Sequence, residues 1–211
     1  MTRGRFIALE GGEGAGKSTQ ARLLAEALAG RGMELVTTRE PGGTPGAEAI
    51  RALLLDTAGD GWGPRAEALL FAAARADHVE RLIRPALAAG KWVICDRYVD
   101  SSRAYQGGGS GLSDAEVLDL HRIGSEGLLP DLTLLLEVPA SLAAERLAAR
   151  DGDAADRIGG RGEAYHARVA AAFARLARAE SARFVRIDAD GPADEVHARI
   201  MAALAPLLTD A

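Results

Sequence analysis

The stretch Gly11-Gly12-Glu13-Gly14-Ala15-Gly16-Lys17-Ser18 decides the fold class, because it has the spacing G-x-x-x-x-G-K-[ST] of a phosphate-binding loop. Before it, residues 5–9 (RFIAL) are short and apolar, which predicts a buried parallel strand. After it, apolar residues recur at three- and four-residue spacing over residues 18–29, which predicts a helix that ends at the following glycines. This strand-loop-helix order is the one that a triphosphate requires; the plain alternative is a glycine-rich turn.

Each part of this loop has a physical role in holding a nucleotide. The glycines let successive backbone N–H groups turn toward phosphate, and the helix dipole adds positive potential. Lys17 is expected to reach the β- and γ-phosphates, and the Ser18 hydroxyl to bind Mg²⁺. The residues predicted to bind ATP in this loop are therefore Gly11, Gly12, Glu13, Gly14, Ala15, Gly16, Lys17, Ser18 and Thr19.

The composition supports Lys17 and limits the class of protein. Only Lys17 and Lys91 among the 25 basic residues are lysines, and a compact ammonium suits a phosphate cradle that a planar guanidinium would crowd. The length of 211 residues fits one domain over residues 1–211, and the net charge of −5 argues against a nucleic-acid polymer as main partner. Cys95 is the only cysteine, and the longest apolar run, 68–74, is too short to span a bilayer. We expect a cytoplasmic protein without a membrane partner.

Strand-like and helix-like segments alternate along the rest of the chain. Further strands are predicted at 34–38, 91–96, 131–138 and 183–188, and helices at 45–55, 64–89, 113–126, 141–150, 161–179 and 192–208. Five strands among helices predict an α/β fold with a parallel sheet covered on both faces. Ligands of such sheets gather at the carboxyl ends of the strands. The polar segments 38–44, 95–98 and 104–109 follow the second and third strands and are therefore expected to form one crevice.

With these motifs in place, the chain closely resembles the bacterial thymidylate kinases, which transfer the γ-phosphoryl group of ATP to the 5′-phosphate of dTMP to give dTDP and ADP. The resemblance covers nearly the whole chain and rests on GGEGAGKST, TREPGGT, LLFAAARADHVERLIRPAL, CDRY with SSRAYQGGG, PDLTLLLEV and DRI, in that order. It implies a P-loop kinase fold with five parallel strands in the order 2-3-1-4-5, a P-loop at 11–18, a mobile lid at about 146–162, a homodimer, and a role in dTTP synthesis. Strand order, lid and dimer come from the resemblance alone.

The resemblance also assigns residues to the base of dTMP. Phe71 is similar to the phenylalanine that stacks on thymine in the family, and Arg75 to the residue that donates to thymine O4. Such a donor would meet the amino group of cytosine, which is itself a donor, and so it selects thymine or uracil. Without the family, Phe71 would be an ordinary core aromatic and Arg75 a solvated charge. Ser102 and Gln106 are weaker candidates for the same pocket.

Other residues are implied to hold the sugar and phosphate of dTMP. Arg39 and Arg97 resemble the clamp on the 5′-phosphate, where a planar guanidinium pairs well with phosphate oxygens. Tyr105 resembles the residue whose ring closes the space beside the ribose 2′ carbon. Glu13 is implied to lie near the 3′-hydroxyl, since the triphosphate would repel a carboxylate. The alternatives are a structural Asp96–Arg97 ion pair and a solvent-facing Glu13.

The reaction needs positioning and charge neutralisation more than covalent help, because the phosphoryl group passes through a loose transition state. The acceptor phosphate has a pKa of about 6, so it needs no strong base at pH 7. The obstacle is repulsion between two anions. The catalytic residues are predicted to be Lys17, Asp96, Arg97 and Arg157, with Asp96 and Ser18 holding Mg²⁺.

Three arginines, at 146, 150 and 157, occupy lid-like positions, and the bacterial branch of the family uses a lid arginine beside the transferring group. Arg157, in the DRI motif, is the expected catalytic one, and Arg150 is expected to bind ATP. The lid departs from the family pattern, because Gly159-Gly160 stand where Glu is common and Tyr165 stands where Phe is common. We therefore expect a looser lid.

Two other functions fit the loop alone. One is a P-loop kinase with a different nucleotide or small-molecule acceptor. The other is a nucleotide-dependent switch, but guanine recognition in such switches usually uses an Asn-Lys-x-Asp loop and this sequence contains no asparagine. The histidines at 78, 121, 166 and 197 lack a metal-ligand spacing and are expected to be structural or exposed.

Overall fold

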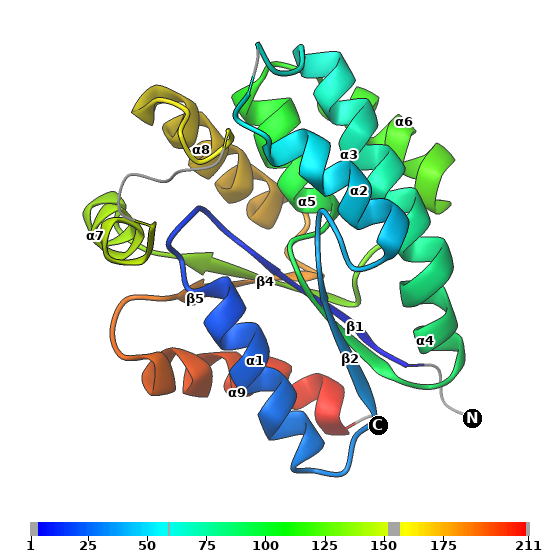
Figure 1. The fold of residues 1–211 in the computed structure, drawn as a ribbon. Coiled ribbons are helices and arrows are strands. Elements are labelled where there is room, and N and C mark those ends of the chain that lie inside the picture. Colours follow the sequence, from blue (N-terminus) through cyan, green and yellow to red (C-terminus); the bar gives the residue numbers. More distant parts are fainter. Residues whose placement is uncertain (1–3, 59, 152–156, 210–211) are drawn as a thin grey trace.

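The computed structural model describes residues 4–58, 60–151 and 157–209, and it is organised around a five-stranded parallel sheet (Figure 1). The strand order is β2-β3-β1-β4-β5, which confirms the predicted 2-3-1-4-5 order. The strands are β1 Phe6–Glu10, β2 Leu35–Arg39, β3 Trp92–Asp96, β4 Leu132–Glu137 and β5 Phe184–Asp188.

The register of the sheet brings the predicted polar segments together. Asp96 at the end of β3 lies opposite Leu9 of β1 on one side and opposite Arg39 of β2 on the other. The carboxyl ends of β1, β2 and β3 therefore lie beside one another at the same edge of the sheet. Because the P-loop follows β1 directly, it opens beside the residues that follow β2 and β3.

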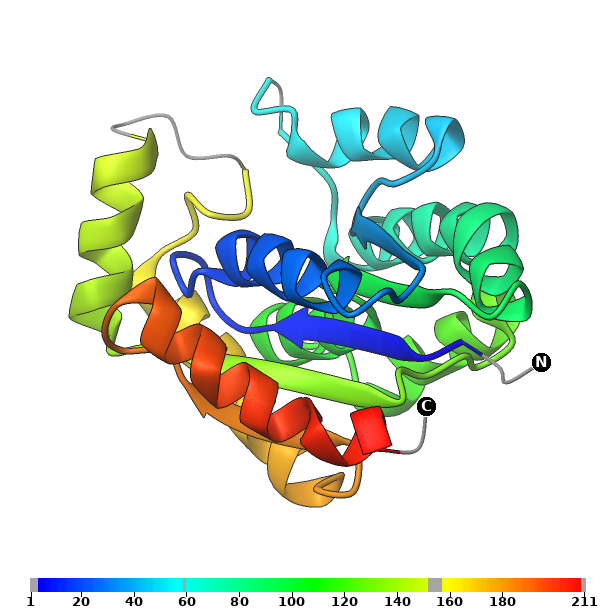
Figure 2. The same cartoon turned by 90° about the horizontal axis from the view of Figure 1, so that it is seen from below.

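Alternate side chains of the strands supply two separate cores, as expected of a sheet that is covered on both faces. Ile7, Leu9, Ile94 and Leu134 pack against α1 Lys17–Ala29 and α9 Ala193–Thr209. These two helices lie below the sheet in Figure 1 and face the viewer in Figure 2.

The opposite face of the sheet carries most of the remaining helices (Figure 1). Phe6, Ala8 and Val93 pack against the helical segment around Val79–Leu87, while Leu135 and Phe184 pack against α8 Glu163–Ala179. The other regular helices are α2 Pro45–Leu55, α6 Asp114–Ser125, which has the predicted Ser113/Glu116 capping box, and α7 Ala140–Asp151.

The helix predicted over 64–89 is not uniform. It consists of α3 Pro64–His78, a wide π-helical turn η1 Val79–Ile83 and α4 Arg84–Ala88. Pro85 has no N–H to donate to the preceding turn, and the Arg84 N–H reaches back to the carbonyl of Val79. The π-helical turn accommodates the hydrogen bond that Pro85 cannot donate, and the chain continues directly into α4.

A second helical segment follows β3 where only a polar cluster was predicted. It comprises α5 Val99–Ser102 and the π-helical η2 Arg103–Gly109. Its polar residues Asp100, Ser102, Arg103 and Gln106 are buried, so no amphipathic period marks the helix in the sequence. A Cβ atom on Gly108 would lie 2.4 Å from the Cβ of Ala172, so a glycine here allows α8 to pack closely.

No helix in the described ranges is both long and apolar enough to traverse a bilayer.

Candidate active site

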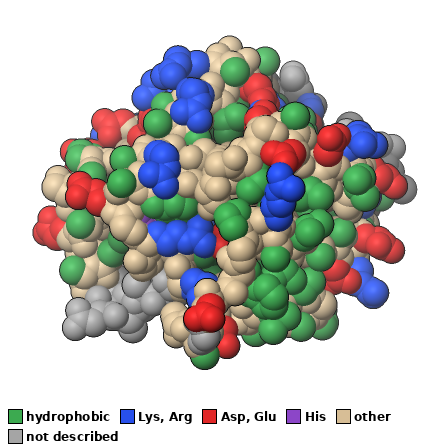
Figure 3. All heavy atoms as spheres, turned by 90° about the horizontal axis from the view of Figure 1, so that it is seen from above, with side chains coloured by type: hydrophobic (Ala, Val, Ile, Leu, Met, Phe, Trp, Pro, Cys, Tyr) green, Lys and Arg blue, Asp and Glu red, His purple; other side chains and the backbone are tan. Residues whose placement is uncertain are grey.

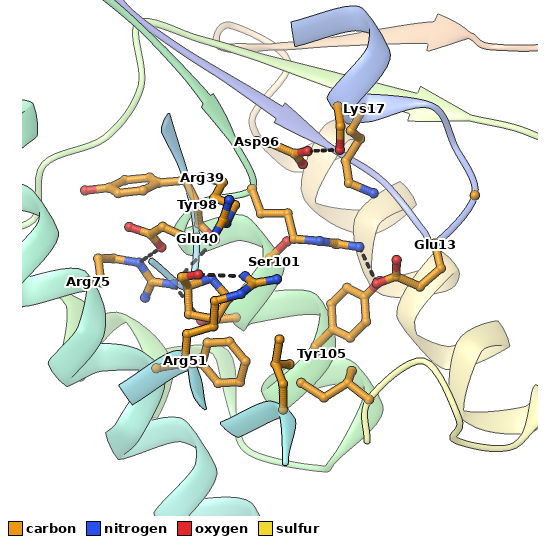
Figure 4. Close-up of a pocket in the computed structure, with 18 of the residues that line it drawn as sticks. Glu13, Lys17, Arg39, Glu40, Arg51, Arg75, Asp96, Tyr98, Ser101 and Tyr105 are labelled. Carbon is orange, nitrogen blue, oxygen red and sulfur yellow. Dashed lines mark hydrogen bonds and ion pairs between the residues drawn. The ribbon is translucent and has the colours of Figure 1, made fainter. Parts of the chain in front are cut away.

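A cavity of about 430 Å³ lies at the carboxyl ends of the central strands and gathers most of the predicted site residues (Figure 4). Figure 3 views the molecule from above the fold of Figure 1 and shows basic side chains gathered beside apolar ones on this side. The predicted residues that line the cavity are Glu13, Gly14, Gly16, Lys17, Ser18, Thr19, Arg39, Phe71, Arg75, Asp96, Arg97, Ser102, Tyr105 and Gln106. The sequence thus predicted a set of residues that the fold brings together.

Glycines determine the backbone conformation of the P-loop. Gly11 has φ 139°, and a Cβ there would lie 2.3 Å from the carbonyl oxygen of Leu136. Gly14 and Gly16 also adopt left-handed angles, with φ of 72° and 88°. Ala15 is buried in the core beneath the loop. These backbone angles require glycine, as the motif predicts.

Lys17 is folded back onto the loop. Its Nζ donates to the carbonyl oxygens of Gly12 at 2.7 Å and Gly11 at 3.2 Å. Burial and the positive charge of Arg97 lower the pKa of Lys17 to about 8. An anion in the cavity would therefore stabilise a charged form that burial disfavours.

Ser18 and Asp96 meet at the mouth of the P-loop. The Ser18 hydroxyl donates to Oδ2 of Asp96 at 2.5 Å. Within the described part of the chain, His, Cys, Asp and Glu side chains do not form a three-residue metal cluster. Mg²⁺ does not need one, because it usually keeps several waters and binds one or two protein oxygens plus phosphate. The Ser18–Asp96 pair of oxygens therefore fits Mg²⁺.

Arg97 links the P-loop to the opposite side of the cavity. One guanidinium nitrogen, Nη2, lies 2.5 Å from Glu13, and the other, Nη1, donates to the Gly11 carbonyl at 3.1 Å and to Ser101 Oγ at 3.2 Å. The guanidinium also lies 5.1 Å from the centre of the Tyr105 ring. Arg97 thus pairs with Glu13, and both side chains line the cavity.

Arg75 occupies the far side of the cavity from Lys17 and Asp96 (Figure 4). It is buried, and its Nε donates to Oε2 of Glu40 at 2.7 Å. Its Nη2 donates to the Ser102 hydroxyl at 2.8 Å. Phe71, one helical turn earlier on α3, lines the same cavity. This arrangement places an aromatic side chain and a fixed guanidinium in one cavity, which suits a planar ring with an acceptor oxygen.

Arg39 and Arg51 stand at the outer rim. Arg39 is half-exposed, and its Nη2 contacts both oxygens of Glu48 at 3.0 and 3.1 Å. Arg51 was not predicted, although it lines the cavity and donates to the Pro41 carbonyl at 2.7 Å. Its sequence signal was helical spacing, because Arg51 and Leu55 share one face of α2 and both line the cavity.

Glu10 is a second residue that sequence reasoning missed. It ends β1 and is fully buried, and Oε1 accepts from the backbone N–H groups of Tyr98 at 2.8 Å and Ser101 at 3.0 Å. Its Oε2 accepts from the Ser101 hydroxyl at 2.6 Å. Burial, followed by the negative charge of Asp100, raises the pKa of Glu10 to about 7. An acidic residue at the end of an apolar strand was the available signal.

The lid arginines lie in different places. Arg146 lines the cavity and donates to the carbonyl of Ala189 at 3.3 Å. Arg157 instead donates to the carbonyls of Asp56 at 2.5 Å and Ala58 at 2.6 Å, so the structure does not bring it to the P-loop. The side chain of Arg150 lies outside the described residues.

Arg161, which was not predicted, anchors the described end of the lid. It forms an ion pair with the buried Glu67 of α3 and donates to the hydroxyl of Tyr165 at 2.7 Å. Ile158 is buried in the core that also holds Tyr105. The described residues just after 156 are therefore packed against the side of the cavity that Tyr105 lines.

Comparisons with known proteins agree with this geometry. The family model for thymidylate kinase matches residues 9–200. A thymidylate kinase of Rhizorhabdus wittichii is 60% identical over 205 residues, 97% of this chain and 99% of that protein. A thymidylate kinase of Caulobacter vibrioides is 50% identical over 200 residues, 95% of each chain. The crystal structure of thymidylate kinase from Ehrlichia chaffeensis superposes with a TM-score of 0.76 at 31% identity, covering 96% of this chain and 99% of that one. The chain belongs to the thymidylate kinase family.

Proposed function

We infer that the protein phosphorylates dTMP to dTDP with ATP as donor, a step toward dTTP. Membership of the thymidylate kinase family supports this activity. The observation that carries it is that one cavity is lined by a P-loop lysine, Lys17, and, on the far side, by Arg75, with Phe71 also in its lining. The P-loop suits the triphosphate of ATP, and the far side suits a pyrimidine with an oxygen at C4.

The acceptor is proposed to bind between α3 and η2. Phe71 stacks on thymine and Arg75 donates to O4, with Ser102 and Gln106 completing the pocket. Cytosine would present an amino donor to Arg75 and leave a buried donor unpaired, which costs affinity. The ring of Tyr105 closes the space beside the 2′ carbon.

The phosphate of the acceptor is proposed to bind where Arg97 and Arg39 face the cavity. Arg97 already bridges the P-loop and the acceptor side through Gly11 and Ser101. It can therefore contact the acceptor phosphate while it stays near the donor. Glu13, its ion-pair partner, lies close enough to turn toward the 3′-hydroxyl as the phosphate takes over the guanidinium.

The chain's residues then act by charge neutralisation. Lys17 and Arg97 offset the repulsion between the two phosphate groups in the loose transition state. Ser18 and Asp96 would hold Mg²⁺, which supplies positive charge to the transferring phosphoryl oxygens. Arg146 is the lid arginine that lines the cavity. Catalytic participation of Arg157 requires its guanidinium to leave the carbonyls of residues 56 and 58, and we propose that it exchanges these contacts for the phosphates of ATP.

One experiment tests the activity. Purified protein is incubated with Mg-ATP and dTMP, dUMP, dCMP, UMP or AMP, and ADP release is measured. We expect fast turnover on dTMP and slow turnover on dCMP and AMP. Equal turnover on all five would defeat the acceptor assignment, and slow ATP hydrolysis that no acceptor accelerates would favour a nucleotide-dependent switch.

We further propose a cytoplasmic homodimer. Leu53 on α2, Leu69 on α3 and Ile123 on α6 are 52%, 56% and 72% exposed, an arrangement that a second copy could cover. A free, buried Cys95 is consistent with a reducing compartment.

A further inference from the structure

His78 lies at the end of α3, fully buried beneath the segment that follows β2. Its Nδ1 is 3.1 Å from Oε1 of Glu40, and its Nε2 is 2.7 Å from the hydroxyl of Thr38. An ionised carboxylate can only accept a hydrogen bond, so Nδ1 carries a proton and donates to Glu40. The Thr38 hydroxyl, which can donate or accept, is the hydrogen-bond partner of Nε2.

The contact continues through Glu40 to the base pocket. Glu40 is 5% exposed, and its second oxygen, Oε2, accepts from Nε of Arg75 at 2.7 Å (Figure 4). The two carboxylate oxygens therefore have different partners. Because His78 occupies Oε1, the carboxylate cannot turn about its last bond without losing one of two buried hydrogen bonds.

This arrangement fixes the direction of the Arg75 guanidinium. Nε is held by Glu40 on one side, and Nη2 is held by the Ser102 hydroxyl on the other. Nη2 also donates to the Tyr98 carbonyl at 3.5 Å, and within the described residues Nη1 is the guanidinium nitrogen without a hydrogen bond, so it is the one that could meet a ligand in the cavity that Arg75 lines. A change in the Glu40 carboxylate would rotate the planar fork and move Nη1.

We propose that His78 is a positioning residue for pyrimidine recognition, holding through Nδ1 the carboxylate of Glu40 that directs Arg75 at the C4 oxygen of the acceptor base. This inference rests on the proposed function of Arg75. His78 would act through Glu40 and Arg75, because His78 itself is not among the residues that line the cavity.

A purely structural role would depend on the volume of the ring. A Cβ built on Gly43 would lie 2.6 Å from Nε2 of His78, so the ring fills the space under the loop at 41–44. The two roles make different demands on the side chain: positioning needs a donor at the Nδ1 place, whereas filling needs bulk.

Two amide substitutions separate these demands. In His78→Asn the side-chain amide nitrogen can take the place of Nδ1, whereas in His78→Gln the larger side chain puts its amide near the place of Nε2. We expect His78→Gln to raise KM for dTMP about tenfold, with kcat within a factor of two, because the bond to a charged group is lost. The preference for dTMP over dCMP in kcat/KM should fall by a similar factor. His78→Asn should keep KM within about threefold.

The opposite order, with His78→Asn more impaired than His78→Gln, would indicate a filling role and overturn the proposal. An unchanged KM in both variants would overturn it as well. Thr38→Val gives a further measurement if His78→Gln fails to fold, since it keeps volume and removes the hydroxyl partner of Nε2. We expect a KM for dTMP raised about threefold in Thr38→Val, and no change would count against the proposal.

Arg75→Ala in the same assay tests the role of Arg75 in base recognition separately from the positioning role of His78. If Arg75→Ala abolishes the preference for dTMP over dCMP while His78→Gln does not alter it, the assignment of Arg75 stands and the positioning role of His78 is refuted. If Arg75→Ala leaves the preference intact, both fall. Affinity for ATP, measured by calorimetry, serves as the folding control and should be equal in all variants.

Discussion

Replacing Glu10 with Gln should stabilise the fold at alkaline pH. The carboxyl of Glu10 is fully buried, and burial and the charge of Asp100 raise its pKa to about 7, although the hydrogen bonds from Ser101 and Tyr98 and the charge of Arg97 oppose this. Gln keeps the size of the side chain and a carbonyl oxygen for the two backbone donors, and its amide group carries no charge. The substitution therefore removes the cost of a buried charge with little change in packing.

The magnitude follows from the pKa of Glu10. Its ordinary value is 4.5 and its value in the fold is about 7. Because a tenfold change in a binding constant corresponds to about 1.4 kcal/mol, this difference corresponds to about 3 kcal/mol of unfolding free energy. The folded protein holds the proton more tightly than the unfolded chain. This contribution is therefore complete below pH 4.5 and is lost as the pH rises through 7.

Urea unfolding at pH 5, 6, 7 and 8 measures the effect. The free energy of unfolding of Glu10→Gln relative to the wild type should increase between pH 5 and 7 and level off at about 3 kcal/mol by pH 8. Glu116→Gln is the matched control, since hydrogen bonds from the Ser113 backbone and side chain lower the pKa of that exposed carboxyl. Its difference from the wild type should be constant across the same range. A difference for Glu10→Gln that does not vary with pH would refute the reasoning.

Four further outcomes are expected. Lys17→Ala should fold, with an unchanged far-ultraviolet circular dichroism spectrum, and lose about 10³ in kcat, because the cation is gone from the loose transition state; a kcat near wild type would contradict its role. Burial and the charge of Arg97 lower the pKa of Lys17 to about 8, and a bound phosphate should raise this pKa again. ATP binding at pH 8.5 should therefore take up protons. Calorimetry would detect this uptake as binding heats that differ between buffers of different ionisation enthalpy. Tyr105→Ala should raise the ratio of kcat/KM for UMP to that for dUMP, and an unaltered ratio would argue that another group excludes ribose. Leu69→Glu should convert a dimer to a monomer in light scattering after gel filtration; a wild-type protein that is already monomeric would rule the dimer out.

The strands and the P-loop could be predicted because each depends on a pattern of residues that are close together in the sequence. A run such as residues 5–9 has to be buried on both faces, and Gly14 and Gly16 have backbone angles that favour glycine. Such patterns involve neighbours within a few residues. For the same reason, helix 114–125 could be predicted from its Ser113/Glu116 capping box.

The helical segment 99–109 and the partners of the lid arginines could not be predicted in this way. Asp100 and Arg103 are buried in ion pairs with each other and with residues far along the chain, such as Arg183 and Glu180, so the segment has no apolar period. The residues beside Arg157 in the sequence give no hint of its contact with residues 56 and 58.

The sequence by itself determined that a P-loop follows a buried strand in a parallel α/β sheet, and the resemblance to thymidylate kinases supplied the strand order and the identity of the pocket residues. Only the tertiary structure decided that Arg97 pairs with Glu13, that Glu10 is buried beneath Ser101, and that His78 contacts Glu40 behind Arg75. The physical reason is the sequence separation over which each interaction acts. Backbone angles and hydrophobic periods act over a few residues, whereas the partner of a buried charge is set by which strands and helices the sheet places next to each other.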